Sequence, residues 1–352
     1  MKTIMKTLLV SIASLSLMFS VNAGELTVNG TAKATYNMTS GVQDDNGIGV
    51  TNELNFTASG EMDNGYTWSY SMELDPATSG SGTGDANTNG QANNDDTALS
   101  LKMNDMGTIK VCVSECGNNK KYAFDNSAYT KLTDTGYSEG IVYPSDLGAY
   151  ASVQYHTPEL PFGTTASIGY GQGKADGQSG NTTGVAASNS LEEYSLVTKP
   201  IDGLTLSASY YEGKDYDDGL TTEEALEEGG AWGIKYAYGN ATLGYGKSYI
   251  SPETTTATRT AGTTTAEHYK NTGMSVGYAV NDSLSVSYTR EKSDISYQTS
   301  ATASNDIKMN SYQLAYSMGG ATLSLARADY DNAGYAKDVD VSETILAVAF
   351  AF

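Results

Sequence analysis

The sequence lacks most of what a helical membrane protein or a nucleic-acid-binding protein depends on. Its 352 residues have a mean hydropathy of −0.36, and no segment is apolar over the length that a transmembrane helix needs. Basic residues are scarce, with 20 Lys and Arg against 41 Asp and Glu and a net charge of −21. Binding to nucleic acid rests on neutralising phosphates, so this charge excludes it. A membrane-spanning version of this chain must therefore be a β-barrel.

What the sequence does contain is tyrosine in alternating segments. There are 26 Tyr against 6 Phe and 2 Trp, and Tyr favours strands and membrane interfaces. In residues 66–74, large apolar side chains alternate with small or polar ones, and segments 204–210, 232–238 and 274–280 repeat the pattern. One apolar face opposite a polar one fits a wide barrel, which turns its apolar face to lipid around a wet interior.

The first 23 residues have the features of a secretory signal. Lys2 and Lys6 precede a short apolar core at 8–19, and small residues close the segment at Val21-Asn22-Ala23. The core is too short and too rich in Ser to span a bilayer well. We expect residues 1–23 to be a cleaved signal peptide and residues 24–352 to form the barrel.

The last residues read as a strand with one lipid-facing side. Leu346, Val348, Phe350 and Phe352 alternate with three alanines. A terminal Phe fits a strand that ends at a membrane boundary with its ring in lipid.

Sixteen such strands can be placed along the chain. They are expected at 25–36, 50–61, 66–74, 96–104, 108–113, 149–157, 164–171, 192–199, 204–212, 231–238, 241–249, 268–280, 283–291, 307–317, 321–330 and 338–352.

The connections between these strands alternate between short and long. Several short ones carry hairpin chemistry, such as Asp63-Asn64-Gly65, Gly239-Asn240 and Asp202-Gly203. The pattern predicts an all-β fold: a 16-stranded antiparallel transmembrane β-barrel with short periplasmic turns and long outer loops. The long loops are expected at 37–49, 75–95, 114–148, 172–191, 213–230, 250–267, 292–306 and 331–337.

This layout resembles the general bacterial outer-membrane porins, most nearly those of the Rhodobacter type from alphaproteobacteria. The resemblance covers the whole chain after the signal, and its evidence is the signal peptide, the strand count, the terminal Phe and a third loop longer than the others. It implies a homotrimer in the outer membrane of a Gram-negative bacterium, in contact with lipid and lipopolysaccharide, passing small hydrophilic solutes and ions without an enzyme activity or a required cofactor. It also implies that the third loop, near 114–148, folds into the pore. The Pro-Glu-Phe-Gly-Gly signature of enteric porins is absent.

The resemblance further implies a constriction where acids of the third loop face basic residues of the wall, creating a transverse field that acts on permeating ions. For each residue, an ordinary solvated charge on a wet wall is the alternative. The candidate acids are Glu115, Asp125, Asp134, Glu139 and Asp146, and the candidate bases, assigned to the lumen by strand parity, are Lys33, Lys102, Lys110, Lys199 and Lys235. Three cations, Lys247, Arg290 and Arg327, fall on the apolar parity instead, which predicts strand ends or bulges there.

Cys112 and Cys116 lie where the fifth strand enters the third loop. An oxidising periplasm favours a disulfide between them over two free thiols. A straight strand would hold their Cα atoms roughly 13 Å apart, so the bond requires a tight turn after Cys112.

Acidic outer loops predict Ca²⁺ binding as an alternative to a simple hydrophilic surface, because unpartnered acids repel unless hard cations bridge them. The candidate ligands are Asp44, Asp45, Asp215, Asp217 and Asp218.

Two other functions compete with a channel. An outer-membrane hydrolase of the phospholipase type needs a Ser-His pair on the outer wall. Gly136–Gly140 matches a nucleophile pattern that has meaning only in an α/β sheet, and His156 has lumen parity. A secreted β-rich adhesin would lack the terminal Phe and the regular alternation of loop lengths.

Overall fold

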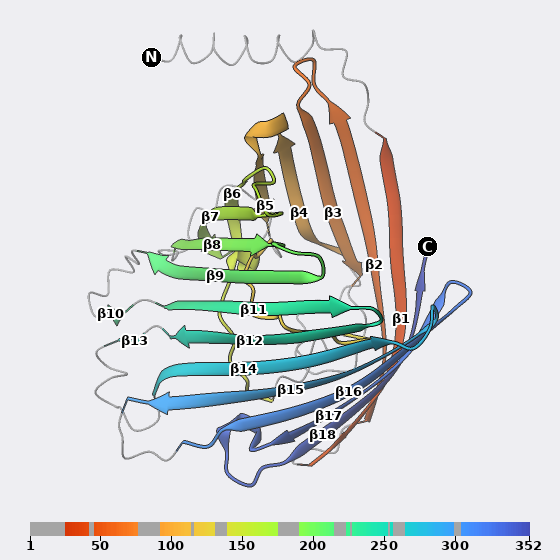
Figure 1. Ribbon diagram of the computed structural model, residues 1–352, viewed down its shortest axis with the longest axis vertical. Coiled ribbons are helices and arrows are strands. Elements are labelled where there is room, and N and C mark those ends of the chain that lie inside the picture. Colours follow the sequence, from red (N-terminus) through yellow and green to blue (C-terminus); the bar gives the residue numbers. More distant parts are fainter. Residues whose placement is uncertain are drawn as a thin grey trace.

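The chain folds into one closed antiparallel barrel of sixteen strands, seen from the side in Figure 1. The computed structural model describes residues 25–41, 46–76, 92–113, 116–130, 139–174, 190–214, 223–225, 227–252, 254–255, 265–298 and 304–352.

Each strand pairs with its neighbours in sequence, and the first pairs with the last. The barrel strands are β1 (Leu26–Ser40), β2 (Asn46–Glu61), β3 (Thr67–Pro76), β4 (Ala92–Lys102), β5 (Thr108–Val113), β6 (Tyr150–His156), β7 (Thr165–Lys174), β8 (Ser190–Thr198), β9 (Leu204–Lys214), β11 (Glu228–Tyr238), β12 (Ala241–Ser251), β14 (Ala266–Ala279), β15 (Leu284–Tyr297), β16 (Ile307–Met318), β17 (Ala321–Asp331) and β18 (Val341–Ala351).

Little other regular structure is present in the described part of the chain. Strands β10 (Glu223–Ala225) and β13 (Thr254–Thr255) form a separate two-stranded sheet, and three short 3₁₀ turns are η1 (Asn104–Met106), η3 (Leu147–Ala149) and η4 (Ala333–Tyr335). Over these same residues, no helix has the length and apolar character to cross a membrane.

The final residue helps to close the ring. Gly30 N donates to Phe352 O at 2.8 Å, and Phe352 N donates to Gly30 O at 3.0 Å. A Cβ at residue 30 would lie 3.0 Å from the Phe352 ring, so glycine is what lets the ring lie against β1. Phe350 and Phe352 face outward, whereas Ala347 is 1% exposed on the inner side. The predicted alternation of the last strand, with its large apolar side chains facing outward, is confirmed.

All sixteen predicted strands are present, and the largest errors are at the ends facing the long loops. Strand β15, predicted to end at 291, continues to Tyr297. Near that end the outward residues become charged, as at Lys292 and Asp294, and the apolar alternation that marks a lipid-facing strand disappears. The backbone ladder continues regardless, because its hydrogen bonds do not depend on which side chains face outward.

The prediction for Lys247, Arg290 and Arg327 was wrong. The three residues lie inside β12, β15 and β17, in uninterrupted register with both neighbouring strands. They are exposed on the outer face of the barrel, between buried inward neighbours.

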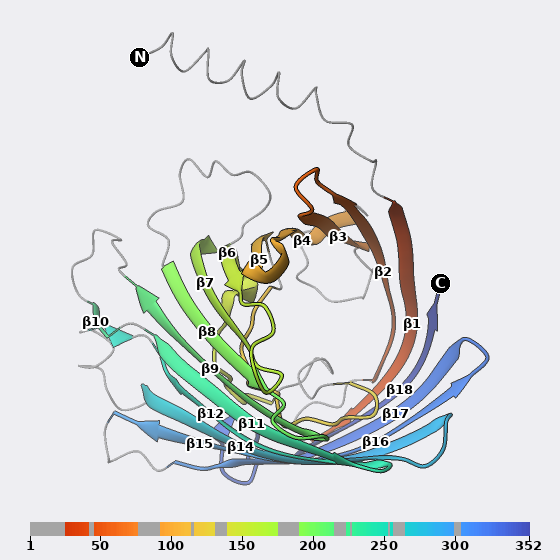
Figure 2. The same ribbon diagram turned by 45° about the horizontal axis from the view of Figure 1, so that its top comes forward.

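The interior is not uniformly wet. At the loop end of β14–β18, an apolar cluster fills the space inside the wall, and residues Ile141, Ala333 and Tyr335 outside the strands complete it. Its strand members are Ala266, Ile295, Ile307, Met309, Ala328, Tyr330 and Val341. Figure 2 shows the yellow segment that leads into this region lying inside the ring of strands.

Candidate functional site

The third long loop starts from a disulfide. Cys112 and Cys116 are bonded with their Cα atoms 6.2 Å apart, which confirms the predicted disulfide. The side-chain amide of Gln154 in β6 donates to the backbone oxygen of Cys116 at 2.7 Å, and the Asn118 side chain donates to Gln154 Oε1 at 2.9 Å. The bond and the amide contacts together fix the direction in which the loop leaves the wall.

From there, residues 116–130, here called the first arm, run along the inner wall from β6 towards β16. Serine hydroxyls of the wall accept hydrogen bonds from the arm's backbone: Ser209 from Lys120 N at 2.8 Å, Ser275 from Asn126 N at 2.9 Å and Ser287 from Ala128 N at 2.8 Å. Gln313 then accepts from Tyr129 N at 2.9 Å. Backbone donors that turn away from water need such partners, and small side chains let the arm approach closely.

Phe124 locks the middle of this arm. Its side chain is 3% exposed and occupies a depression in the wall made by glycines. A Cβ on Gly246 would lie 3.1 Å from the Phe124 ring, and one on Gly273 or Gly244 would collide with the ring or with the Phe124 backbone. The missing side chains therefore create the space that holds the ring.

Residues 139–148, here called the return arm, are also held by the wall. Tyr143 OH donates to Glu291 Oε2 at 3.0 Å, and Leu147 N donates to Glu193 Oε2 at 2.8 Å. Both glutamates are 1% exposed. A buried carboxyl group is costly unless it is hydrogen-bonded. The two hydrogen bonds therefore stabilise the buried glutamates and hold the return arm against the wall.

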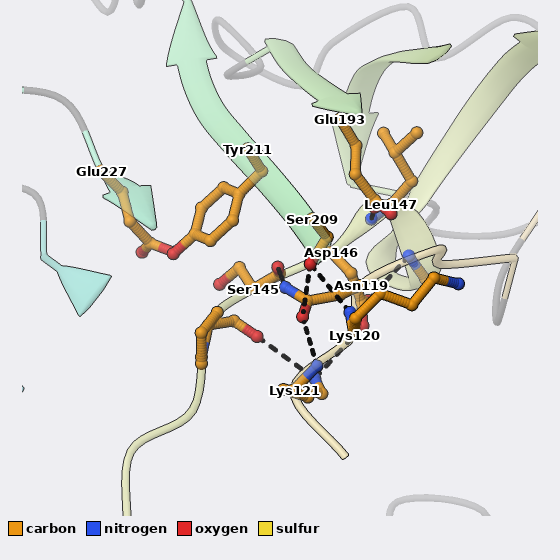
Figure 3. Close-up of polar contacts among 12 residues, drawn as sticks. Asn119, Lys120, Lys121, Ser145, Asp146, Leu147, Glu193, Ser209, Tyr211 and Glu227 are labelled. Atoms are coloured by element: carbon orange, nitrogen blue, oxygen red, sulfur yellow. Dashed lines mark hydrogen bonds and ion pairs between the residues drawn. The ribbon is translucent and has the colours of Figure 1, made fainter. Parts of the chain in front are cut away.

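The two arms are joined to each other, as Figure 3 shows. Lys121 Nζ lies 3.2 Å from Asp146 Oδ2 and donates to the backbone oxygen of Pro144, also at 3.2 Å. Asn119 donates to the backbone oxygen of Ser145 at 2.8 Å. The arms therefore behave as one unit pressed against the wall, although residues 131–138 between them lie outside the described residues.

The charges on the first arm face charges of opposite sign on the wall. Asp125 interacts with Lys235 of β11 and accepts hydrogen bonds from Ser127 Oγ at 2.8 Å and Thr289 Oγ1 at 3.2 Å. Burial raises the pKa of Asp125 above the usual carboxyl value, and the hydrogen bonds and Lys235 only partly offset this.

Lys120 has the opposite arrangement. Burial lowers its pKa, and attraction to Glu193 of β8 opposes the shift. The loop is therefore not uniformly acidic. At Lys120 the loop carries the positive charge and the wall the negative one, whereas at Asp125 the loop is negative and the wall positive.

The other candidate acids are spread more widely than expected. Asp146 pairs with Lys121 within the loop. Glu139 lies near η4, where its backbone oxygen accepts from Gly334 N at 2.7 Å, and burial raises the pKa of its side chain. Glu115 and Asp134 lie outside the described residues.

The candidate bases fall into two groups. Lys33, Lys110 and Lys235 lie within strands, and Lys33 Nζ is 6.0 Å from the centre of the Tyr129 ring at the end of the first arm. Lys102 is the last residue of β4, and Lys199 lies one residue beyond β8. These last two border short turns, away from the first arm.

The candidate Ca²⁺ ligands Asp44, Asp45, Asp215, Asp217 and Asp218 all lie outside the described residues. Within the described ranges, no group of three or more potential ligands could hold a metal ion.

Sequence reasoning missed the parts that hold the loop: the wall serines, Phe124 and the two buried glutamates. Strand parity does place Glu193 and Glu291 on the inner face, and that signal could have been read. The serine and glycine positions become meaningful only once the path of the loop is known.

A model of one protein family decides the identity of this barrel. The family described as Gram-negative porin matches residues 8–334. This chain belongs to the Gram-negative porin family.

Solved porins share the fold of this porin at low sequence identity. OmpF of Salmonella typhi, in complex with daunomycin, is 16% identical with a TM-score of 0.69, covering 94% of this chain and 98% of the other. OmpT of Vibrio cholerae in its trimer form is 12% identical with a TM-score of 0.63, covering 94% and 100%. A triple mutant of Rhodopseudomonas blastica porin is 14% identical with a TM-score of 0.58, covering 93% and 100%. A search of curated proteins gives no match.

The porin is an outer-membrane β-barrel that forms a channel, and it is not an enzyme. The hydrolase and adhesin alternatives are thereby set aside. His156 shares a hydrogen bond with Gln154 at 3.0 Å, and Gln154 is on the inner wall, so this histidine is not part of an outer-wall Ser-His pair.

Proposed function

We propose that this porin passes small hydrophilic solutes and ions through an eyelet that its third loop narrows. The observation that carries this is the attachment of both loop arms to the inner wall. The first arm is held at its start, where Cys116 contacts Gln154, and at its end, where Tyr129 contacts Gln313. The return arm is held where Tyr143 contacts Glu291. A loop held at so many points reduces the open cross-section instead of closing the channel intermittently. The acids Asp125 and Asp146, together with Lys33, Lys110, Lys120 and Lys235, supply the charge at this eyelet.

The test is single-channel recording in planar bilayers with polymers of graded size. Folded protein should give long-lived ohmic steps, and polymers above the eyelet diameter should cease to lower the conductance. A Phe124→Ala variant, which loosens the loop, should admit larger polymers than the wild type. Absence of conductance from protein shown by circular dichroism to be folded β would refute the channel, whereas an unchanged polymer limit in the variant would refute only the role of Phe124 in holding the eyelet.

We also propose that the protein is a homotrimer, as the Vibrio cholerae OmpT structure is described to be. Light scattering that subtracts the detergent mass should give three chains per particle. Mass spectrometry of the purified protein should show that residues 1–23 are removed and that the chain starts at Gly24.

Ca²⁺ at the acidic outer loops is a separate proposal. Calorimetric titration of wild type and of a variant with Asp215, Asp217 and Asp218 changed to Asn should show heat of binding only in the wild type. Absence of heat from the wild type would refute Ca²⁺ binding, whereas equal heats from both proteins would place the site away from Asp215, Asp217 and Asp218.

A further inference from the structure

Backbone strain is concentrated at one contact, between the return arm and the loop that joins β17 to β18. This loop, residues 332–340, is here called the last loop. In the described part of the chain, six residues other than glycine have a left-handed backbone, and four of them lie at this contact: Glu139, Asn332, Tyr335 and Asp338. Asn and Asp adopt this conformation fairly often, whereas Glu and Tyr rarely do. The strain is therefore greatest at Glu139, with φ of 43°, and at Tyr335, with φ of 60°.

The return arm and the last loop touch through their backbones. Gly334 N donates to the backbone oxygen of Glu139 at 2.7 Å. The two segments approach so closely there that a Cβ on Gly140 would lie 2.8 Å from Gly334 Cα. The absence of a side chain at Gly140 is what permits this approach.

The Tyr335 side chain joins the last loop to the wall and to the return arm. Its hydroxyl group shares a hydrogen bond of 2.7 Å with Ser293 Oγ of β15 and accepts another from the backbone of Val142. Asn305 donates to the Tyr335 backbone oxygen at 3.2 Å. The ring is buried in the apolar cluster, 5.6 Å from the Tyr269 ring. Strained backbone persists only where the surrounding structure fixes it, and these contacts do so at Tyr335.

Separation of the two segments would break these contacts and also release the strain. The two effects oppose each other, so the joined arrangement is favoured by less than its contacts alone suggest. Packed interfaces tend to have two discrete arrangements instead of deforming continuously. The return arm has further hydrogen bonds to Glu193 and Glu291 of the wall, so the last loop is the segment that can leave.

The last loop occupies part of the lumen. Ala333 and Tyr335 are buried members of the cluster that fills the space inside the wall of β14–β18. Departure of the loop would take both side chains out of this space and widen the passage on that side of the barrel.

We propose that the last loop is a strained latch with two states. In the closed state, which this structure shows, Tyr335 lies in the apolar cluster and the loop narrows the lumen. In the open state Tyr335 has left the cluster and the channel conducts more. The proposal rests on the channel function proposed above.

The test is single-channel recording of the full-length folded protein in planar bilayers. Wild type should stay mainly at one conductance level and make brief visits to a higher one. Tyr335→Phe removes the hydroxyl contacts with Ser293 and Val142, so it should raise the occupancy of the higher level at least about twofold, the lower end of what one hydrogen bond contributes. A single level in both proteins would overturn the latch, whereas absence of any conductance would refute the channel function on which it rests.

A matched pair of variants tests the role of strain. Glu139→Gly and Glu139→Ala remove the same side chain and keep the backbone oxygen that binds Gly334. Glycine adopts the left-handed backbone of residue 139 without strain, whereas alanine does not. The Ala variant should therefore occupy the higher level more than the Gly variant does, and equal occupancies would overturn the proposal.

A second pair tests the contact itself. Gly140→Ala places a Cβ against Gly334 and should raise the occupancy of the higher level. Gly319→Ala introduces a side chain at a similar left-handed backbone, with φ of 57°, in the short turn after β16, where a Cβ meets nothing within 4 Å. This control should match wild type. An equal rise in both variants would overturn the proposal, because the effect would then not depend on the contact.

Discussion

At the scale of single residues, Phe124 is the point on which the third loop depends most. Replacing a buried Phe by Ala typically costs about 3–5 kcal/mol, and the glycine-lined depression around Phe124 has no side chains that could refill it. We expect Phe124→Ala to lower the midpoint of thermal unfolding and to increase the noise of single-channel currents. Gly273→Ala changes the wall instead of the loop and should have the same effects, because the added Cβ would collide with the Phe124 ring.

The matched control is Gly47→Ala in β2, where a Cβ would meet nothing within 4 Å. It should leave both the unfolding midpoint and the current noise unchanged. Quiet currents from Phe124→Ala would mean that the serine contacts alone hold the loop.

Asp125 provides a second prediction at this scale, which concerns pH. Because burial raises its pKa, Asp125 becomes neutral on acidification at a higher pH than an exposed aspartate does. The eyelet then loses a negative charge, so cation preference should begin to fall above the usual titration range of carboxyl groups. Reversal potentials measured at a series of pH values should show this step in wild type and in Asp105→Asn, which removes a charge at η1. In Asp125→Asn the step should be missing, and its persistence there would assign it to another group.

At the scale of elements, the disulfide fixes the base of the third loop. Closing so short a loop stabilises a protein by about 2 kcal/mol in the chain-entropy description. Thiol titration of the unfolded, unreduced protein should find no reactive thiol, since both cysteines are bonded. The double variant C112S/C116S should still form a barrel, because Gln154 also holds this region, but its loop should be cleaved faster by protease. Equal cleavage rates would show that the amide contacts suffice.

Elements also show how far the sequence could be read. The lipid-facing alternation and the hairpin residues identified every barrel strand, because both signals are local. Strand ends near the long loops were less accurate, since the ladder of β15 continues to Tyr297 after the apolar pattern stops. The contacts of the third loop could not be predicted, because Ser209, Ser275 and Ser287 resemble any other small inward residues until the arm is placed over them. Strand parity placed Lys247 on the outer face correctly. A strand end or bulge was nevertheless predicted there, because a cation is not expected on a lipid-facing surface.

At the scale of the whole molecule, the balance of charge predicts a mild preference for cations. Acids outnumber bases by 41 to 20 in the sequence, and fixed negative charge at an entrance raises the local concentration of cations. Lys33, Lys110 and Lys235 on the inner wall oppose this effect, so the preference should be small. Reversal potentials under a KCl gradient, repeated at several concentrations, measure both its sign and its origin.

Two sources of selectivity respond differently to salt. Charges on the outer loops are screened beyond about 8 Å at physiological ionic strength, so a preference that they cause should weaken as KCl increases. Asp125 lies in a confined, partly dehydrated position against Lys235 and Thr289, where mobile ions screen poorly, so a preference set there should persist. Anion preference at low salt would mean that the wall lysines outweigh every acid at the entrance. In that case Lys235→Gln should restore cation preference, whereas Lys337→Gln, at an exposed loop position, should not.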